Sequence, residues 1–280
     1  MTYTPTLRAR RVARELKHLR KERKLTGDDV CRLLGWDTSK LSRMENANMR
    51  TTSGEVMELL EVYGITGPRR QEMIQLARDA RKKGWWQDYT DEVKAGFSDY
   101  LALEDEAQTY RAYDVQLIPG PFQTEEYMRA IYRGARPRTE AETQRMVEVR
   151  LARKERLTSS VDSLHVIQVI EEAALRRIVG GRGTMRAQLN HLLELGDLAN
   201  ISIQVVPYRA GVHAAIDGPF ILLTFDSYPD VLYVEHLMGC LYLEMPEETT
   251  RGSLVFDHLR ASALNASDSR ALIKEVARDF

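Results

Sequence analysis

The sequence predicts an α+β fold class: an N-terminal all-α, five-helix helix-turn-helix domain, followed by an α+β domain with a small, mainly antiparallel sheet. Residues 7–83 show helical apolar spacing only, whereas strand-like alternation begins after Ser163. The charge also changes along the chain. Residues 1–83 hold 19 Lys and Arg against 11 Asp and Glu, a net charge of +8, and the remainder carries −9. A basic first domain on an acidic second one indicates a polyanionic partner for the first alone, with chance asymmetry as the alternative.

The chain divides into residues 1–83, a linker or docking segment at 84–96, and a second domain at 97–280. Gly84 ends the basic stretch, and the adjacent Trp85 and Trp86 are unusual in a plain linker. We expect the two indoles to dock one domain on the other. A ligand cage is the alternative.

Helical spacing predicts the first domain's elements in order. A first helix spans 7–24, with Val12, Leu16 and Leu19 inward. A fourth helix is capped by Thr52 or Ser53, buries Val56, Leu59, Leu60 and Tyr63, and ends at Gly64; a fifth runs from Pro68 to about Lys83.

Between them lie two short helices. Thr26 can cap the first of these in a capping box with Asp29, and Gly35 can end it. Asp37 or Thr38 then opens the second. Two short helices around a turn that contains glycine form a helix-turn-helix.

The second short helix has the composition of a DNA-reading helix. Ser39, Arg43 and Asn46 are spaced i, i+4 and i+7 and share one face, while Leu41 and Met44 lie opposite. Arg pairs with guanine or phosphate and Asn with adenine. A solvated surface helix is the alternative, which the preceding helix and turn disfavour. The DNA-binding residues predicted are Thr38, Ser39, Lys40, Ser42, Arg43, Asn46, Arg50 and Thr51.

The run LTGDDVCRLLGWDTSKLSRMEN resembles the xenobiotic-response-element (phage-repressor-like) regulators. The resemblance implies that Arg20, late in the first helix, pairs with Glu45 and holds the reading helix; two solvated charges are the alternative. One departure concerns Gly27, because members often carry a phosphate-contacting Gln there. The following Asp28 and Asp29 would weaken a phosphate contact, so a single half-site should bind weakly.

The apolar pattern of the second domain predicts helices first, then a small sheet, and then further helices. Its helices are expected at 97–113 (with Tyr110 and Tyr113), after Thr124, and at 139–158, 184–197, 247–263 and 268–279. Its strands are expected at 164–170, 201–207, 219–225 and 231–235, the last two joined by a turn at 226–230.

This domain is similar to a C-terminal domain of unknown function found in actinobacterial regulators of the same class. Segments that carry the similarity include YDVQLIPGPFQTEEY, EEAALRR, VVPYRAGVHA and SALNASDSRALI. The resemblance implies control of development and specialised metabolism. It also implies a small companion protein in a toxin–antitoxin-like arrangement.

No G-x-S-x-G, H-E-x-x-H or P-loop motif is present, so we expect no enzyme activity and no cofactor. The 180–183 segment reads as a loop. Glu235, His236 and Cys240 are too few for a metal site, and none is predicted.

A sensor site is predicted where polar residues meet irregular segments. His213 lies in a loop after a strand, and Glu172, Arg176, Arg209 and Glu235 come from other segments. Together they could line a polar pocket. A structural loop histidine is the alternative.

We therefore expect a sequence-specific DNA-binding transcriptional regulator that reads the major groove as a homodimer. Its partners would be a double-stranded DNA operator and a small companion protein or a small-molecule effector. The alternative is an enzyme or small-molecule-binding domain targeted to DNA. With two unpaired cysteines and no membrane-length apolar run, a cytoplasmic, nucleoid-associated location with no membrane partner is expected.

Overall fold

The computed structural model describes residues 7–80, 96–135, 138–159, 163–226 and 229–280. It divides into two compact units, Met1–Gly84 and Trp85–Phe280. The expected docking segment with Trp85 and Trp86 lies outside the described residues except for Gly96. Two residues of the expected turn at 226–230 lie outside them as well.

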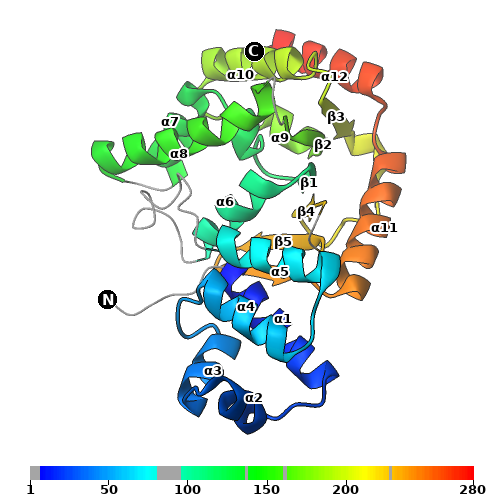
Figure 1. The fold of residues 1–280 in the computed structure, drawn as a ribbon. Coiled ribbons are helices and arrows are strands. Elements are labelled where there is room, and N and C mark those ends of the chain that lie inside the picture. The colour runs from blue at the N-terminus through cyan, green and yellow to red at the C-terminus, as the bar shows by residue number, and fades with distance from the viewer. Residues whose placement is uncertain (1–6, 81–95, 136–137, 160–162, 227–228) are drawn as a thin grey trace. The chain divides into compact units, whose positions relative to one another are not determined.

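The first unit is a bundle of five helices in its described part (Figure 1). The inward residues that the spacing predicted are buried, with Leu16, Leu19, Val56 and Met44 fully enclosed. Helix α5 ends four residues earlier than expected. The helices are α1 (Leu7–Glu22), α2 (Gly27–Leu34), α3 (Thr38–Glu45), α4 (Ser53–Val62) and α5 (Gly67–Asp79).

Side-chain caps set the helix boundaries of this unit. Thr26 and Asp29 form a capping box at the start of α2, and Thr52 and Glu55 form another at α4. Asp37 caps α3, and Gly35 ends α2 in the left-handed region at φ 65°. Since glycine has no Cβ, it adopts this φ at little cost, and the chain turns within three residues.

The second unit combines helices with one sheet. Its helices are α6 (Phe97–Glu106), α7 (Glu125–Ala135), α8 (Glu140–Thr158), α9 (Glu172–Arg176), α10 (Arg182–Leu195), α11 (Pro246–Ser262) and α12 (Ala266–Asp279), with single turns η2 (Gly120–Phe122) and η3 (Tyr208–Ala210). Its strands are β1 (Thr109–Asp114), β2 (His165–Glu171), β3 (Ile201–Val206), β4 (Phe220–Thr224), β5 (Val231–His236) and β6 (Gly239–Leu243).

The sheet of the described part is mixed: three of its five strand pairs are antiparallel, in keeping with the expected mainly antiparallel sheet, and two are parallel, which the sequence did not predict. In the described residues its order is β3-β2-β1-β4-β5-β6. β1, β2 and β3 are parallel, with helices between them in the chain, and β4, β5 and β6 continue antiparallel. The parallel half places the ends of β1, β2 and β3 at one edge of the sheet.

The helix predicted at 97–113 is wrong in its second half. α6 ends at Glu106, and β1 follows within three residues. Tyr110 and Tyr113 fit a helical stripe, but β1 pairs with β2 on one side and β4 on the other. The spacing of these residues fits a helix as well as a strand, and pairing with two strands distant in sequence decided for the strand. The short strand β6 was not predicted.

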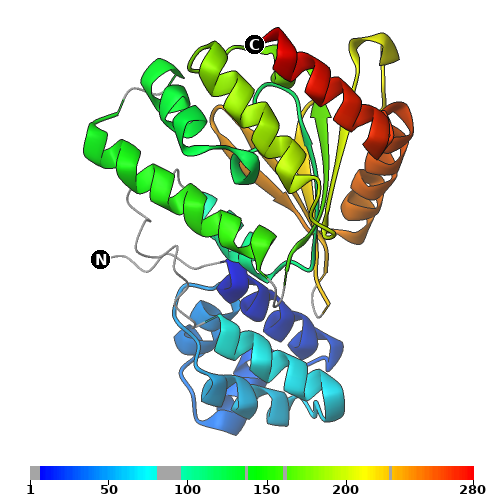
Figure 2. The same ribbon diagram turned by 90° about the horizontal axis from the view of Figure 1, so that it is seen from above.

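Helices cover both faces of the sheet (Figure 2). On one face, Phe256 and Leu259 of α11 pack with Tyr113 and Val169. On the other face, the Tyr100 ring of α6 lies 4.5 Å from that of Tyr233 on β5. None of the helices in the described part of the chain has the length and apolar character that a bilayer crossing requires.

Candidate nucleic-acid interface

Helix α3 presents one polar face and buries the other. Ser39, Arg43 and Asn46 are exposed, as are Thr38 and Ser42. Leu41 and Met44 on the opposite side are 3% and 0% exposed. The structure therefore gathers five of the predicted DNA-binding residues on the outer surface of one short helix, which matches the width of a major groove.

The two residues best suited to base contacts are held by their own helix. The Arg43 Nε donates to the Ser39 carbonyl at 3.2 Å. The Asn46 amide donates to the Ser42 carbonyl at 2.8 Å, and its Oδ1 accepts from Lys17 of α1 at 3.3 Å. These exposed, local bonds can exchange for bonds to a base edge at small net cost.

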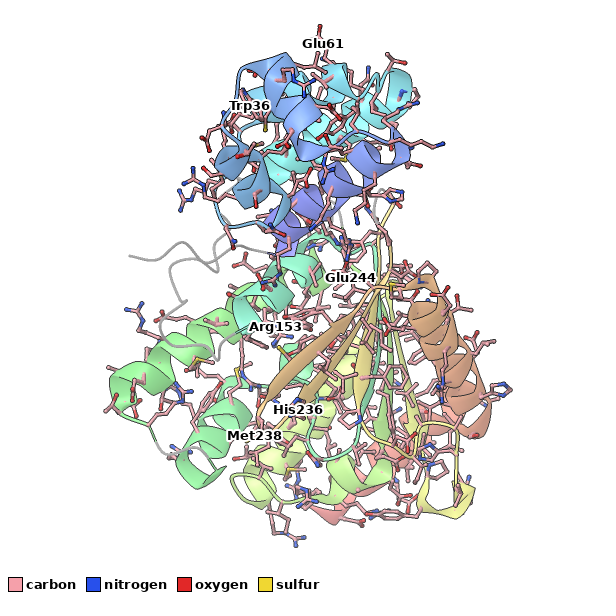
Figure 3. The ribbon with its side chains drawn as sticks, turned by 90° about the horizontal axis from the view of Figure 1, so that it is seen from below. Trp36, Glu61, Arg153, His236, Met238 and Glu244 are labelled. Carbon is pink, nitrogen blue, oxygen red and sulfur yellow. The ribbon has the colours of Figure 1, made fainter. Side chains whose placement is uncertain are left out.

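Lys40 differs from this group. Its ammonium lies 2.9 Å from Glu55 of α4 and 3.8 Å from the ring centre of Trp36, which is labelled in Figure 3. Burial raises the Glu55 pKa, but hydrogen bonds from Thr52 and Lys40 lower it more, so this pKa stays below its ordinary value. Lys40 thus faces a carboxylate within the unit, and its charge is largely neutralised there.

Arg20 and Glu45 are brought together as a two-pronged ion pair. Arg20 donates from Nε to Oε1 at 2.6 Å and from a terminal nitrogen to Oε2 at 2.7 Å. Its remaining terminal nitrogen donates to the Leu25 carbonyl at 2.9 Å. One guanidinium therefore joins the end of α1, the entry to α2 and the last residue of α3.

The start of α2 is occupied by its own acids. The Asp29 carboxylate accepts from the Thr26 hydroxyl and from the Thr26 backbone N–H at 3.0 Å, and these two bonds lower its pKa. A negative carboxylate at this end opposes a DNA phosphate. The loop after α3 carries the other two predicted contacts, exposed Arg50 and half-buried Thr51.

The five predicted sensor residues do not form one cluster. Glu172 and Arg176 pair at 2.7 Å, Arg176 reaches Asp279 at 3.3 Å, and Glu172 accepts from the Tyr208 N–H at 2.9 Å. Arg209 is exposed in η3. Glu235 lies on β5, opposite Cys240 in register.

His213 joins a different cluster, which sequence reasoning missed. Its Nε2 lies 3.0 Å from Glu171, and Glu171 also accepts from the Tyr113 hydroxyl at 2.6 Å. The Nδ1 accepts from the Ala215 N–H at 3.3 Å, so the ring carries its proton on Nε2. Both nitrogens are engaged, and the cluster ties the 207–219 loop to the ends of β1 and β2. Recognising 109–114 as a strand parallel to β2 would have revealed it.

A second buried polar pair lies on the opposite face of the sheet, because Gln168 and Asp114 alternate with Val169 and Tyr113 along their strands. The Gln168 amide donates to Asp114 at 3.0 Å. Desolvation raises the Asp114 pKa to about 6, against the opposing effects of Gln168 and Arg153 and with a smaller contribution from Glu235. In the described ranges, no three His, Cys, Asp or Glu side chains are placed to hold a metal ion.

Comparison with protein families agrees with this architecture. Residues 11–73 match the model of a helix-turn-helix domain, which supports DNA as a partner of a regulator. Residues 97–275 match the model described as a domain of unknown function, DUF5753. No curated protein and no solved structure matches the chain. Because the second match covers well over half of its length, the chain belongs to the DUF5753 family, with a helix-turn-helix domain at its N-terminus.

Proposed function

We propose that this protein is a sequence-specific transcriptional regulator that reads operator DNA as a homodimer, with α3 in the major groove. The single observation that carries the proposal is the exposed face of Ser39, Arg43 and Asn46 on a helix whose other face is buried. The pair Arg20–Glu45 supports it, because it fixes the end of α3 that would carry Asn46 into the groove.

Dimerisation is proposed from the weakness of one half-site. Lys40 is neutralised by Glu55, and Asp29 occupies the start of α2. These two positions therefore add little to the backbone contacts that dominate affinity. Two linked half-sites multiply their affinities through effective concentration.

We further propose that the second unit acts by binding, in the manner of the xenobiotic-response-element regulators, and responds to a small companion protein. The Tyr113–Glu171–His213 cluster supports a structural role for His213, because both imidazole nitrogens have partners within the fold. A hydrolase screen on the full chain is the check, and turnover above background would favour the enzyme alternative.

Genome-wide binding of the tagged full chain tests the main proposal. Wild type should recover a recurrent inverted repeat, because two copies of α3 related by a twofold axis require one. The variant Ser39→Ala/Arg43→Ala/Asn46→Ala, altered only at exposed positions, should lose that repeat. Recovery of the same repeat by both proteins would contradict the assignment of α3, and recovery of no repeat by wild type would contradict sequence-specific binding.

A further inference from the structure

The two edges of the sheet are protected differently. At β3, the Val205 carbonyl accepts from the Leu264 N–H at 2.9 Å, and its N–H donates to the Ser269 hydroxyl at 2.9 Å. The segment that joins α11 to α12 therefore covers this edge. At the other end, β6 is the terminal strand, and β5 is its one strand partner in the described residues.

Within its own residues, strand β6 carries few of the side chains that usually protect an edge. Its contact with the start of α6 is made by the Tyr242 side chain, whose hydroxyl donates to the Gly96 carbonyl at 2.5 Å. Residues 237–245 read LMGCLYLEM, with no proline, no lysine and one charge, Glu244. Leu237 is 90% exposed, Met238 87%, Met245 60% and Leu241 51%. Four large exposed apolar side chains thus fall within nine residues, on and beside one edge strand.

The hydrogen-bonding pattern determines which backbone groups face outward. A two-residue turn, Leu237–Met238, is closed by the pair His236–Gly239. The closing pair of such a turn exchanges both backbone bonds, and pairs then alternate along the ladder. Gly239, Leu241 and Leu243 therefore bond to β5, while the N–H and C=O groups of Cys240 and Tyr242 point to the open edge.

We propose that β6 is a dimer interface that pairs antiparallel with β6 of a second copy of this chain, in a register centred on Leu241. This inference rests on the dimer of the proposed function and gives it a location. In this register Cys240 and Tyr242 of one copy exchange backbone bonds with Tyr242 and Cys240 of the other. Leu241 lies opposite its own symmetry mate.

Self-complementarity favours a second copy over a foreign strand. The register places Leu237 opposite Met245 and Met238 opposite Glu244, so no like charges meet. The second unit and its linker carry a net charge of −9, and a foreign partner would be selected by basic residues. Residues 237–245 carry one charge, so this edge offers little to attract the basic residues of a foreign partner. Figure 3 shows Met238 and Glu244 at opposite ends of the β5–β6 hairpin.

Charge substitutions at Leu241 test the register in the full chain. Because this residue faces itself, Leu241→Lys should place two like charges together and weaken the dimer by at least about tenfold. Mixing Leu241→Lys with Leu241→Glu should restore dimerisation, measured by sedimentation velocity. The matched control is Leu254 on α11, which is 56% exposed: its Lys and Glu variants should dimerise as wild type does.

A disulfide crosslink tests the same register by the appearance of a new bond, so a variant that merely unfolds cannot mimic the expected result. Opposed residues of a non-hydrogen-bonded pair have Cα atoms about 4.5 Å apart, within the range of a disulfide. In a Cys240→Ser background, Leu241→Cys should form an intermolecular disulfide under mild oxidation, whereas Leu254→Cys should not.

The outcomes separate this interface from dimerisation in general. A wild-type dimer that tolerates Leu241→Lys and gives no Leu241→Cys crosslink would overturn the β6 interface and leave the dimeric DNA reader standing. A wild-type chain that sediments as a monomer at all concentrations, and also on DNA, would overturn both. Loss of a lysate partner with Leu241→Lys, without any change in self-association, would assign β6 to a foreign strand and likewise overturn the proposal.

Discussion

Arg20 holds Glu45 through two hydrogen bonds of 2.6 and 2.7 Å, although 25 residues separate them. Their side chains are 15% and 5% exposed, so the pair is largely shielded from water. Removal of the arginine would leave a buried carboxylate without its cation. The reading helix therefore depends on a residue that is not part of its own surface.

We predict that Arg20→Ala destabilises the first unit by about 3 kcal/mol. The measurement is the urea dependence of hydrogen exchange in peptides from α1 and α3. Arg69→Ala is the matched control, because Arg69 pairs with Glu22 at 3.1 Å but both side chains are more than 40% exposed. It should cost less than about 1 kcal/mol. Equal effects of the two variants would contradict the structural role of Arg20.

Arg43→Ala should lower specific operator binding by about 1–3 kcal/mol and relax preference at one base pair per half-site. Fluorescence anisotropy with operator and scrambled duplexes measures both quantities. Arg50→Ala should weaken binding to both duplexes alike and reduce the salt slope by about one. Since Lys40 is paired with Glu55, Lys40→Ala should change the slope by less than about one. An unchanged specific-to-nonspecific ratio for Arg43→Ala would remove α3 as the reading helix.

A fragment ending at Arg81 should be monomeric and lose most operator affinity. The physical reason is the loss of effective concentration once the two half-site readers are no longer linked. Sedimentation and anisotropy on the same fragment give both results. If the fragment bound the operator as tightly as the full chain, dimerisation through the second unit would be unnecessary.

Asp114 gives the second unit a pH-dependent stability. Its folded pKa of about 6 exceeds the ordinary value of 3.8, because burial disfavours the charge. The folded state therefore binds this proton more tightly, and stability falls as pH rises from about 4 through 6, by roughly 1–2 kcal/mol. Asp114→Asn should remove this slope and be more stable than wild type at pH 7.5. Hydrogen exchange of β2 in urea at pH 5 and 7.5 is the measurement, with exposed Asp217→Asn as the control that should keep the slope.

A companion protein that regulates this chain should change operator affinity. Such an effector must bind the DNA-competent and DNA-incompetent states differently, and a tenfold change requires about 1.4 kcal/mol of coupling. The 207–219 loop exposes Val212 and Ile216 and is tied to the sheet by His213. We predict that Val212→Ser/Ile216→Ser reduces the response, measured by titrating a candidate companion, any small protein encoded beside this gene, into the protein–operator complex.

Two further results would revise this prediction. No response from wild type would remove the companion-protein hypothesis, whereas a normal response from the double variant would move the contact to another surface. His213→Ala is a separate probe. It removes the tie to Glu171 and should alter the response through loop position, without removing an exposed contact.

Local sequence signals were sufficient to predict the helices of the first unit. Apolar spacing, the Thr26 and Thr52 caps and the turn at Gly35 set its five helices, because each signal acts within a few residues. The exposed face of α3 follows from the same spacing. The strands β2, β3, β4 and β5 were also recognisable from alternation.

Only the tertiary structure decided the rest. Whether Tyr110 and Tyr113 lie on a helix or a strand depended on β2 and β4, which lie 50 to 115 residues away, and that choice made the sheet mixed. The pairing of Lys40 with Glu55 and of His213 with Glu171 likewise joins separate elements. Spacing in the sequence determines which face of a helix or strand a side chain lies on. The partner it meets is set by how elements pack, since long-range contacts form only once the chain entropy that opposes them has been overcome.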